Sequence, residues 1–277
     1  MTTTLPPAAD PAADDGDLRL RFTSDPAASP LPLDALIDDA ADRAARVAAT
    51  SVAADGGDPP EAVRTAIERD GYVIVRSSGS VAEDVIPVIV SYLGTPLNPY
   101  SSVGVPTAQP VVSKGSSSPD QVWHWHTDSA SWRRPNDYSV LYCVNPAERG
   151  GATDVLDFRA VLASGALSSE AVAVLSSYDV DWPIERSLGG GQWSQPVLGD
   201  ERLRYRRELT TDVGRPALRA AIDELTRVID ECRPSVQALL EPGDALVFDN
   251  RRVLHRAGPC VDPERRRLLL RVKVRAG

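Results

Sequence analysis

The chain has 277 residues, of which 42% are hydrophobic and 25% charged, and its formal net charge is −9. This size and composition suit one large globular domain or two small ones. The acidic balance argues against a nucleic-acid partner, which would need a basic face. The sequence has no apolar run of about 18 residues, and its N-terminus lacks the basic and apolar regions of a signal peptide. We therefore expect neither a membrane partner nor export.

Three cysteines, Cys143, Cys232 and Cys260, are widely spaced and form no CxxC pair. An odd number at such spacing does not suit a disulfide framework or a zinc knuckle. We expect reduced thiols in a cytoplasmic protein.

The first residues, 1–30, are rich in Ala, Pro and Asp, which predicts a mobile N-terminal arm. We expect residues 31–277 to form a single domain. Apolar residues recur at helical spacing over 32–53 and predict an amphipathic helix, which opens an N-terminal helical segment. Three further elements are predicted before residue 100: a helix over 60–69 ended by Gly71, a buried strand over 72–75 and a helix over 81–93.

After residue 100, short apolar runs alternate with Gly, Pro and Ser, which is typical of an antiparallel sandwich or barrel. Six strands are predicted from these runs, over 109–113, 121–125, 138–144, 153–157, 245–248 and 268–274. Helices over about 158–176 and 215–231 interrupt the series. Helices followed by a double sheet predict an α+β fold with a jelly-roll core flanked by helices.

The chain has three histidines, and two of them lie beside Asp128. We expect residues 122–128 to be a strand that runs into a turn, and side chains of a strand alternate between its faces. His126 and Asp128 then project to the same side, close enough to hold one cation. His124 falls on that side too and competes with His126 as a ligand.

The third histidine, His255, follows a tight turn and an apolar strand within 242–250, which would deliver it to the same site. Two histidines and one carboxylate on one face of a metal are the arrangement of non-haem Fe(II) oxygenases. Thr153 places a hydroxyl at the start of another strand. The last strand carries basic residues on alternate positions, and an arginine fork can pair with a carboxylate through two hydrogen bonds.

Taken together, these residues resemble the Fe(II)/2-oxoglutarate-dependent dioxygenases of the taurine dioxygenase and 2,4-dichlorophenoxyacetate dioxygenase family, to which clavaminate synthase-like enzymes are related. The matching segments run in family order over residues 100–275: Trp125–Asp128, Arg149–Thr153, Gly243–His255 and Arg266–Arg271. The resemblance implies a double-stranded β-helix, or jelly-roll, core. It implies His126, Asp128 and His255 as the iron ligands.

The resemblance also implies that 2-oxoglutarate chelates the iron, with its far carboxylate held by Thr153 and a C-terminal arginine. The family pattern of two arginines maps onto Arg267 for 2-oxoglutarate and Arg271 for the substrate. Arg266 is the competing choice for the first position. Strand alternation puts Arg266 on the opposite face from Arg271, so Arg267 is favoured.

The activity implied is hydroxylation of an unactivated C–H bond of a small molecule, with O2 consumed and succinate and CO2 released. An amino acid or a specialised-metabolite intermediate would be a suitable substrate. Asp128 disfavours halogenation, because related halogenases carry Gly or Ala at that position. Desaturation, epoxidation and ring closure use the same iron site and stay open, as does a jelly-roll metal-binding protein that uses no 2-oxoglutarate.

Three side chains are weaker candidates for substrate contacts. Arg204 and Arg206 alternate along the chain, so one of them could face the cavity and bind an anion, or both could belong to a solvated edge strand. Trp125 could line the site or pack in the core. The oligomeric state is left open.

Overall fold

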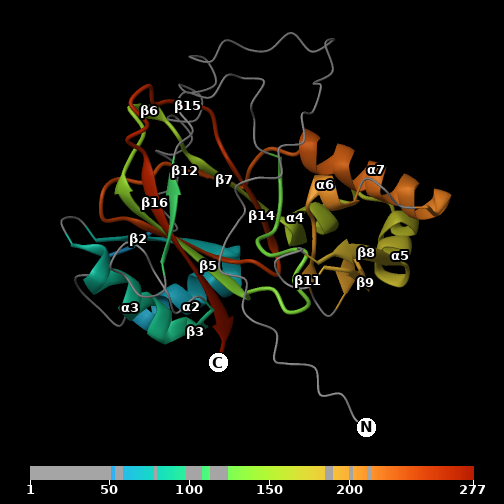
Figure 1. The fold of residues 1–277 in the computed structure, drawn as a ribbon, viewed down its shortest axis with the longest axis horizontal. Coiled ribbons are helices and arrows are strands. Elements are labelled where there is room, and N and C mark those ends of the chain that lie inside the picture. The colour runs from blue at the N-terminus through green and yellow to red at the C-terminus, as the bar shows by residue number, and fades with distance from the viewer. Residues whose placement is uncertain are drawn as a thin grey trace.

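A computed structural model describes residues 51–53, 59–77, 80–97, 108–112, 124–184, 190–199, 202–210 and 214–277. The predicted mobile arm over 1–30 and most of the predicted helix over 32–53 lie outside these residues. Figure 1 shows a sheet-rich part that carries the chain's C-terminus and a helical part around α5 and α7.

The three elements predicted over residues 60–93 are confirmed. Helix α2 (Pro59–Asp70) ends where Gly71 adopts a φ of 83° and its N–H donates to the Ile67 carbonyl. Strand β2 (Tyr72–Arg76) and helix α3 (Ala82–Leu93) follow. The last three residues of the predicted 32–53 helix instead form β1 (Ser51–Ala53), parallel to β2, because the edge of β2 offers unpaired backbone groups.

Seven of the described strands form one large sheet. Their order is β1-β2-β13-β5-β16-β3, and β4 also pairs with β16. The bounds are β13 (Ala245–Asp249), β5 (Tyr138–Asn145), β16 (Leu268–Ala276), β3 (Gly94–Pro96) and β4 (Gln109–Val112). All pairs except β1–β2 are antiparallel. Helices α2 and α3 cover one face of this sheet through a shared apolar core.

A smaller antiparallel sheet packs on the other face of the large one. It consists of β12 (Val236–Ala238), β7 (Thr153–Asp157) and β14 (Val253–Ala257). A common core joins the two sheets: Leu246 and Phe248 come from the large sheet, and Val155 and Val253 from the small one. The α+β class with mostly antiparallel sheets is therefore confirmed.

The helical part has a core of its own, built around Trp182, Leu225 and Leu254. Its elements are α4 (Phe158–Ala163), α5 (Ser169–Ser177), β8 (Asp179–Pro183), β9 (Gln192–Pro196), β10 (Leu198–Gly199), β11 (Arg202–Leu203), α6 (Arg207–Thr210) and α7 (Pro216–Glu231). The single helix predicted over 158–176 is wrong. It is broken between α4 and α5, where Gly165 has a φ of 70° and the Ser168 hydroxyl caps α5 by accepting from Ala171 N.

Two short strands, β6 (Arg149–Gly150) and β15 (Cys260–Val261), pair beside the small sheet. All three cysteines are free thiols, as predicted. Among the described helices, none has the length and apolar character needed to cross a membrane.

Candidate metal and cosubstrate site

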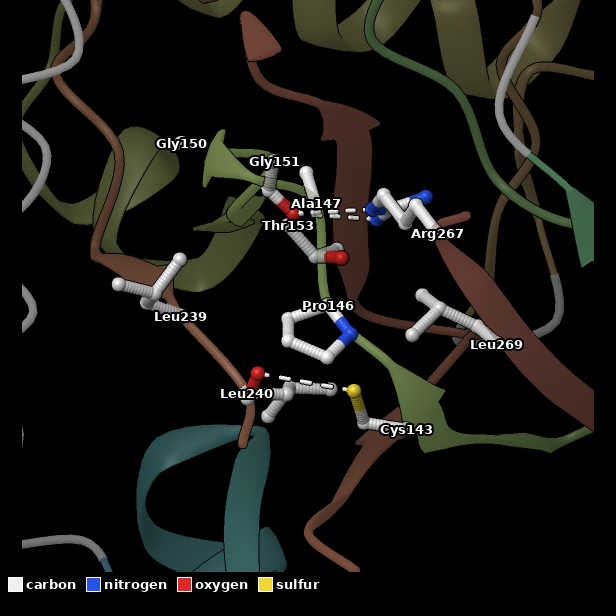
Figure 2. A pocket seen from close by; sticks show the side chains of 10 residues that line it. All are labelled: Cys143, Pro146, Ala147, Gly150, Gly151, Thr153, Leu239, Leu240, Arg267 and Leu269. Atoms are coloured by element: carbon white, nitrogen blue, oxygen red, sulfur yellow. Dashed lines mark hydrogen bonds between the residues drawn. The ribbon is translucent and has the colours of Figure 1, made fainter. Parts of the chain in front are cut away.

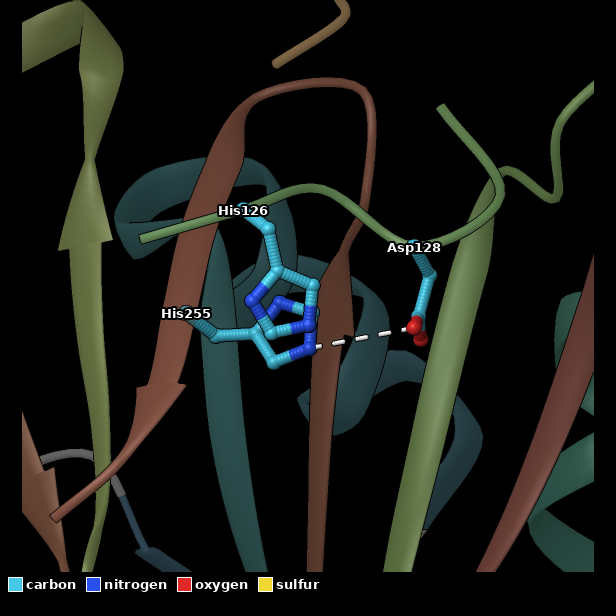
Figure 3. A group of neighbouring side chains, drawn as sticks. All are labelled: His126, Asp128 and His255. Atoms are coloured by element: carbon cyan, nitrogen blue, oxygen red, sulfur yellow. Dashed lines mark ion pairs between the residues drawn. The ribbon is translucent and has the colours of Figure 1, made fainter. Parts of the chain in front are cut away.

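The predicted strand over 121–125 is wrong in its described part. His124 and Trp125 belong to no strand, and His126 forms isolated bridges with Arg206 and His255. The main chains of His126 and His255 exchange two hydrogen bonds, of 3.1 and 3.0 Å. This antiparallel bridge brings the two imidazole rings side by side, with their centroids 4.3 Å apart (Figure 3).

Thr127 turns away from this cluster. Its N–H donates to the Tyr205 carbonyl at 2.8 Å, and its hydroxyl accepts from Tyr205 N at 3.1 Å. His126 and Asp128 therefore project to the opposite side, where His255 arrives from β14 (Figure 3). Ligand atoms of these three residues all lie within 4.8 Å of one another. The sequence prediction that they converge is confirmed by this geometry.

Hydrogen bonds orient the rings of His126 and His124. Nδ1 of His126 lies 3.1 Å from the His124 carbonyl, which can only accept, so Nδ1 carries the proton and Nε2 is available as a ligand. His124 itself points elsewhere, and its Nδ1 accepts from Arg207 at 3.0 Å. Burial, helped by the charge of Arg207, lowers the pKa of His124. His124 thus lies outside the three-residue cluster.

The Asp128 carboxylate is nearly inaccessible, with 2% of the residue exposed. Its Oδ1 lies 3.9 Å from His255 Nε2 and accepts from Arg271 Nη1 at 3.0 Å. Burial favours the neutral acid, but the charges of Arg271, His255 and Lys273 together outweigh that effect and hold the pKa of Asp128 below its usual range. A carboxylate and two imidazoles fit the donor set of a non-haem iron site.

A small pocket lies between the sheets and is lined by Thr153, Arg267 and the side chains of Leu240 and Leu269 (Figure 2). Arg267 is 7% exposed, and its guanidinium donates to the Gly151 carbonyl, from Nε at 3.2 Å and Nη2 at 3.1 Å. Among the described residues no carboxylate pairs with this guanidinium. Burial lowers the pKa of Arg267.

Gly151 is required for this close approach. Its φ is +75°, and a Cβ there would lie 2.9 Å from Ala147 Cβ and 3.2 Å from Arg267 Nε. Any side chain would be strained and would displace the guanidinium. Gly151 of the matched segment Arg149–Thr153 therefore has a packing reason.

Strand register connects the pocket with the cluster of His126, Asp128 and His255, the candidate metal cluster. On the small sheet, His255 pairs with Val155 and Ala257 with Thr153. Paired residues and alternate residues project to the same side, so Thr153 and His255 share the inner face of this sheet. On the opposite sheet, Arg271 of β16 faces Asp128, and Arg267, directly before β16, lines the pocket. The pocket and the metal cluster are thus neighbouring parts of one interior.

Arg266 lies outside the pocket. Its side chain is 61% exposed and faces Glu264 at 3.3 Å. The buried Asp262 carboxylate accepts from the backbone N–H of both Arg266 and Arg267, at 3.0 Å each, and so fixes the chain as it enters β16. Both arginines precede β16, and Arg266 is exposed whereas Arg267 is buried. Which of them binds 2-oxoglutarate stays a prediction.

The weaker substrate candidates lie outside the metal cluster. Trp125 is fully buried in the core of the helical part, with the Arg256 guanidinium 4.3 Å from its ring centroid. Arg204 is buried and donates to the Trp132 carbonyl at 2.7 Å, which holds the turn after Asp128. Arg206 pairs with Glu208 at 3.4 Å. Their roles in substrate binding stay predictions.

Sequence reasoning missed two residues that contact Asp128. Ser139, on β5, donates from its hydroxyl to Asp128 Oδ2 at 2.7 Å. The Asn250 amide accepts from Asp128 N at 2.7 Å and donates to Asp128 O at 3.0 Å. Asn250 lies within the matched segment Gly243–His255, and this position pointed to a functional role. Ser139 lies inside a strand, where no sequence pattern pointed to a role.

Comparisons with known proteins identify the family of the chain. The family model described as "Taurine catabolism dioxygenase TauD, TfdA family" matches residues 38–273. A uridine-5'-phosphate dioxygenase from Amycolatopsis sp is 34% identical over 148 residues, which are 48% of this chain and 53% of that relative. The match thus spans about half of that relative's length. A uridine-5'-phosphate dioxygenase from Streptomyces sp is 28% identical over 235 residues, covering 77% of this chain and 81% of the relative.

Solved structures show the same fold. The non-heme iron oxygenase OrfP in complex with Fe has a TM-score of 0.59 at 21% identity, over 88% of this chain and 92% of that one. A taurine dioxygenase from Burkholderia xenovorans gives 0.59 and 21%, over 80% and 83%. Asparagine oxygenase in complex with Fe(II), hydroxyasparagine and succinate gives 0.58 and 20%, over 87% and 91%. Since the family model covers most of the sequence, the chain belongs to the TauD/TfdA family of iron- and 2-oxoglutarate-dependent dioxygenases.

Proposed function

We propose that the chain binds Fe(II) through His126, Asp128 and His255, and 2-oxoglutarate through Arg267 and Thr153, and that it hydroxylates a small molecule. One observation carries the cosubstrate assignment. Arg267 is a buried cation whose guanidinium meets a carbonyl but no carboxylate among the described residues. A buried charge without a counter-ion is costly, so an anionic ligand in the adjoining pocket would stabilise it.

The arrangement of the interior supports the same assignment. Thr153 and His255 share one inner face, and Arg267 lines the pocket from the opposite side. A diacid with one end at the metal cluster and the other at Arg267 would lie between the two sheets. We propose that these sheets are the double-stranded β-helix expected of the family.

The bound iron and 2-oxoglutarate supply the oxidising chemistry with O2, with succinate and CO2 as co-products. The chain's own residues orient the reactants. His126 offers Nε2 because the His124 carbonyl holds the proton on Nδ1. The ionised Asp128 fills the position that halogenases leave open, which favours hydroxylation. Leu240 and Leu269 give the pocket apolar walls that exclude water from the Arg267–carboxylate pair.

We propose nucleoside 5'-monophosphates as the first substrate class to test. Both curated relatives are uridine-5'-phosphate dioxygenases. The inner face of β16 also places two cations, Arg271 and Lys273, close enough to Asp128 to lower its pKa. Asp128 offsets one of these two charges, and a substrate that carries an anionic group suits the other.

The cosubstrate assignment is tested without a substrate. Fe(II) and 2-oxoglutarate are added to the metal-free protein under anaerobic conditions, and the weak visible charge-transfer band of a chelated keto acid is recorded. We expect a band in the wild type and none in His255→Ala. A folded, iron-loaded protein without the band would contradict the proposal and favour a metal-binding protein that uses no 2-oxoglutarate.

The substrate is then sought by product mass. Nucleoside monophosphates, amino acids and small carboxylates are incubated with Fe(II), 2-oxoglutarate and O2, and succinate release is measured in parallel. Hydroxylation adds one oxygen to the substrate, whereas desaturation or ring closure removes two hydrogens. Uridine 5'-monophosphate that is unchanged while an amino acid gains oxygen would overturn the nucleotide assignment and leave the iron site intact.

A further inference from the structure

The two oxygens of the Asp128 carboxylate have different surroundings. Oδ1 faces His255 Nε2 at 3.9 Å, so it is the oxygen directed toward the metal cluster. Oδ2 accepts from the Ser139 hydroxyl at 2.7 Å. Ser139 is fully buried, and Asn136 Nδ2 donates to its oxygen at 2.8 Å. Because a hydroxyl has one proton, the Asn136 contact leaves that proton directed at Asp128.

The main chain of Asp128 is held as firmly as its side chain. The Asn250 amide bonds both the N–H and the carbonyl of Asp128, at 2.7 and 3.0 Å. The same Nδ2 donates to the Asn136 carbonyl at 3.0 Å. Asn250 is 1% exposed and lies in the turn between β13 and β14, the strand that carries His255. The Asn250 side chain therefore links the Asp128 main chain to the turn that precedes the strand of His255.

We propose that Ser139 and Asn250 are positioning residues for the metal: Ser139 occupies Oδ2, Asn250 fixes the Asp128 backbone, and Oδ1 is thereby presented toward His126 and His255. The inference rests on the proposed iron site.

The neighbouring Arg271 explains why Oδ2 of Asp128 needs a partner such as the Ser139 hydroxyl. Its Nη1 already donates to Oδ1 at 3.0 Å, and an arginine fork readily binds both oxygens of a carboxylate. Without the Ser139 hydroxyl, Oδ2 is free to rotate toward the guanidinium. The carboxylate would then be a poorer metal ligand although every ligand residue is still present.

The test is a titration of the full, metal-free chain with Co(II) alone, followed by its visible ligand-field absorption under anaerobic conditions. Removal of a partner of a metal ligand weakens metal binding by roughly 10- to 100-fold. We expect Ser139→Ala to raise the Kd for Co(II) by about 10-fold and to change the band shape. Ser139→Thr, which keeps the hydroxyl, restores both.

Ser77→Ala is the matched control. Ser77 is also buried, 1% exposed, and its hydroxyl donates to a backbone carbonyl, that of Gly243, away from Asp128. The Ser77→Ala variant loses one buried hydrogen bond but should bind Co(II) as the wild type does. Asn250→Ala should weaken Co(II) binding further. If it fails to fold, the comparison of Ser139→Ala with Ser77→Ala still decides.

The outcomes separate the inference from the iron site. Co(II) binding that is lost in His255→Ala but unchanged in Kd and spectrum in Ser139→Ala overturns the positioning role alone. A wild type that binds no Co(II) overturns the iron site and the inference together. A weakened Ser139→Ala beside an intact Ser77→Ala supports the inference whether or not 2-oxoglutarate binds.

Discussion

Arg271 lies in β16 and Arg267 directly precedes it, yet the surroundings of their two charges differ. Arg271 donates to the carboxylate of Asp128 at 3.0 Å. Arg267 is more deeply buried, with 7% of the residue exposed, but its guanidinium meets only the Gly151 carbonyl in the described part of the chain. Asp128 thus offsets the charge of Arg271, whereas Arg267 stays a cation that a ligand in the pocket can neutralise. Substitutions at the Asp128–Arg271 pair and at Arg267 should therefore have opposite consequences for folding and binding.

The largest effect is expected from Asp128→Asn. The change removes a metal ligand and the carboxylate that faces Arg271. We expect no measurable Co(II) binding and a fall of about 3 kcal/mol in the free energy of unfolding of the metal-free protein, because a buried ion pair is broken on one side. Urea denaturation measures the stability. An unchanged midpoint would show that Asp128 and Arg271 are not coupled.

Arg271→Met should destabilise the protein in a pH-dependent way. The pKa of Asp128 lies below its usual value of 3.8 in the folded wild type, so its ionised form stabilises the fold above that pH. This contribution is lost as the pH falls from about 3.8 toward the folded pKa. The substitution raises the folded pKa, so we expect a deficit at pH 7 that shrinks below about pH 4.

Urea unfolding of metal-free wild type and Arg271→Met at pH 7 and at pH 3.5 measures this difference. Arg267→Met serves as the contrast, since no carboxylate of the described chain depends on it. Its stability should be unchanged within about 1 kcal/mol or increased, because a buried charge is replaced by an apolar side chain. A deficit for Arg271→Met that does not vary with pH would contradict the coupling to Asp128.

The smallest effect is expected from Thr153→Val at the pocket end. The substitution keeps the shape of a buried side chain and removes one hydroxyl. A hydrogen bond to a charged group contributes about 1.5–3 kcal/mol, so the affinity for 2-oxoglutarate should fall by roughly 10-fold or more. Isothermal titration under anaerobic conditions checks it. Equal affinity would exclude the Thr153 hydroxyl as a 2-oxoglutarate contact.

The convergence of His126 and Asp128 is predictable from the sequence, because its signal is local. The spacing of His126 and Asp128 needs only a bend that keeps both on one side, even though the segment is a bridge and not a strand. Strand alternation likewise predicted the inward position of Arg267.

Other features depend on contacts between distant segments, which no local pattern encodes. Ser139 matters only because β5 passes beside Asp128, and Ser51–Ala53 forms a strand only because β2 has an open edge. Trp125 is enclosed by the helical part, which the sequence did not place. The break between α4 and α5 has local signals, Gly165 and the capping Ser168. These signals outweigh the helical spacing of the residues on either side.

The most direct test of the account is a titration with 2-oxoglutarate of iron-loaded wild type, Arg267→Met and Arg266→Met in the absence of O2. The two arginines are neighbours in sequence but differ in burial, since Arg267 is 7% exposed and the Arg266 side chain 61%. The account predicts at least a 30-fold loss of affinity, about 2 kcal/mol or more, for Arg267→Met and none for Arg266→Met. Full affinity in Arg267→Met, or a comparable loss in Arg266→Met, would contradict it.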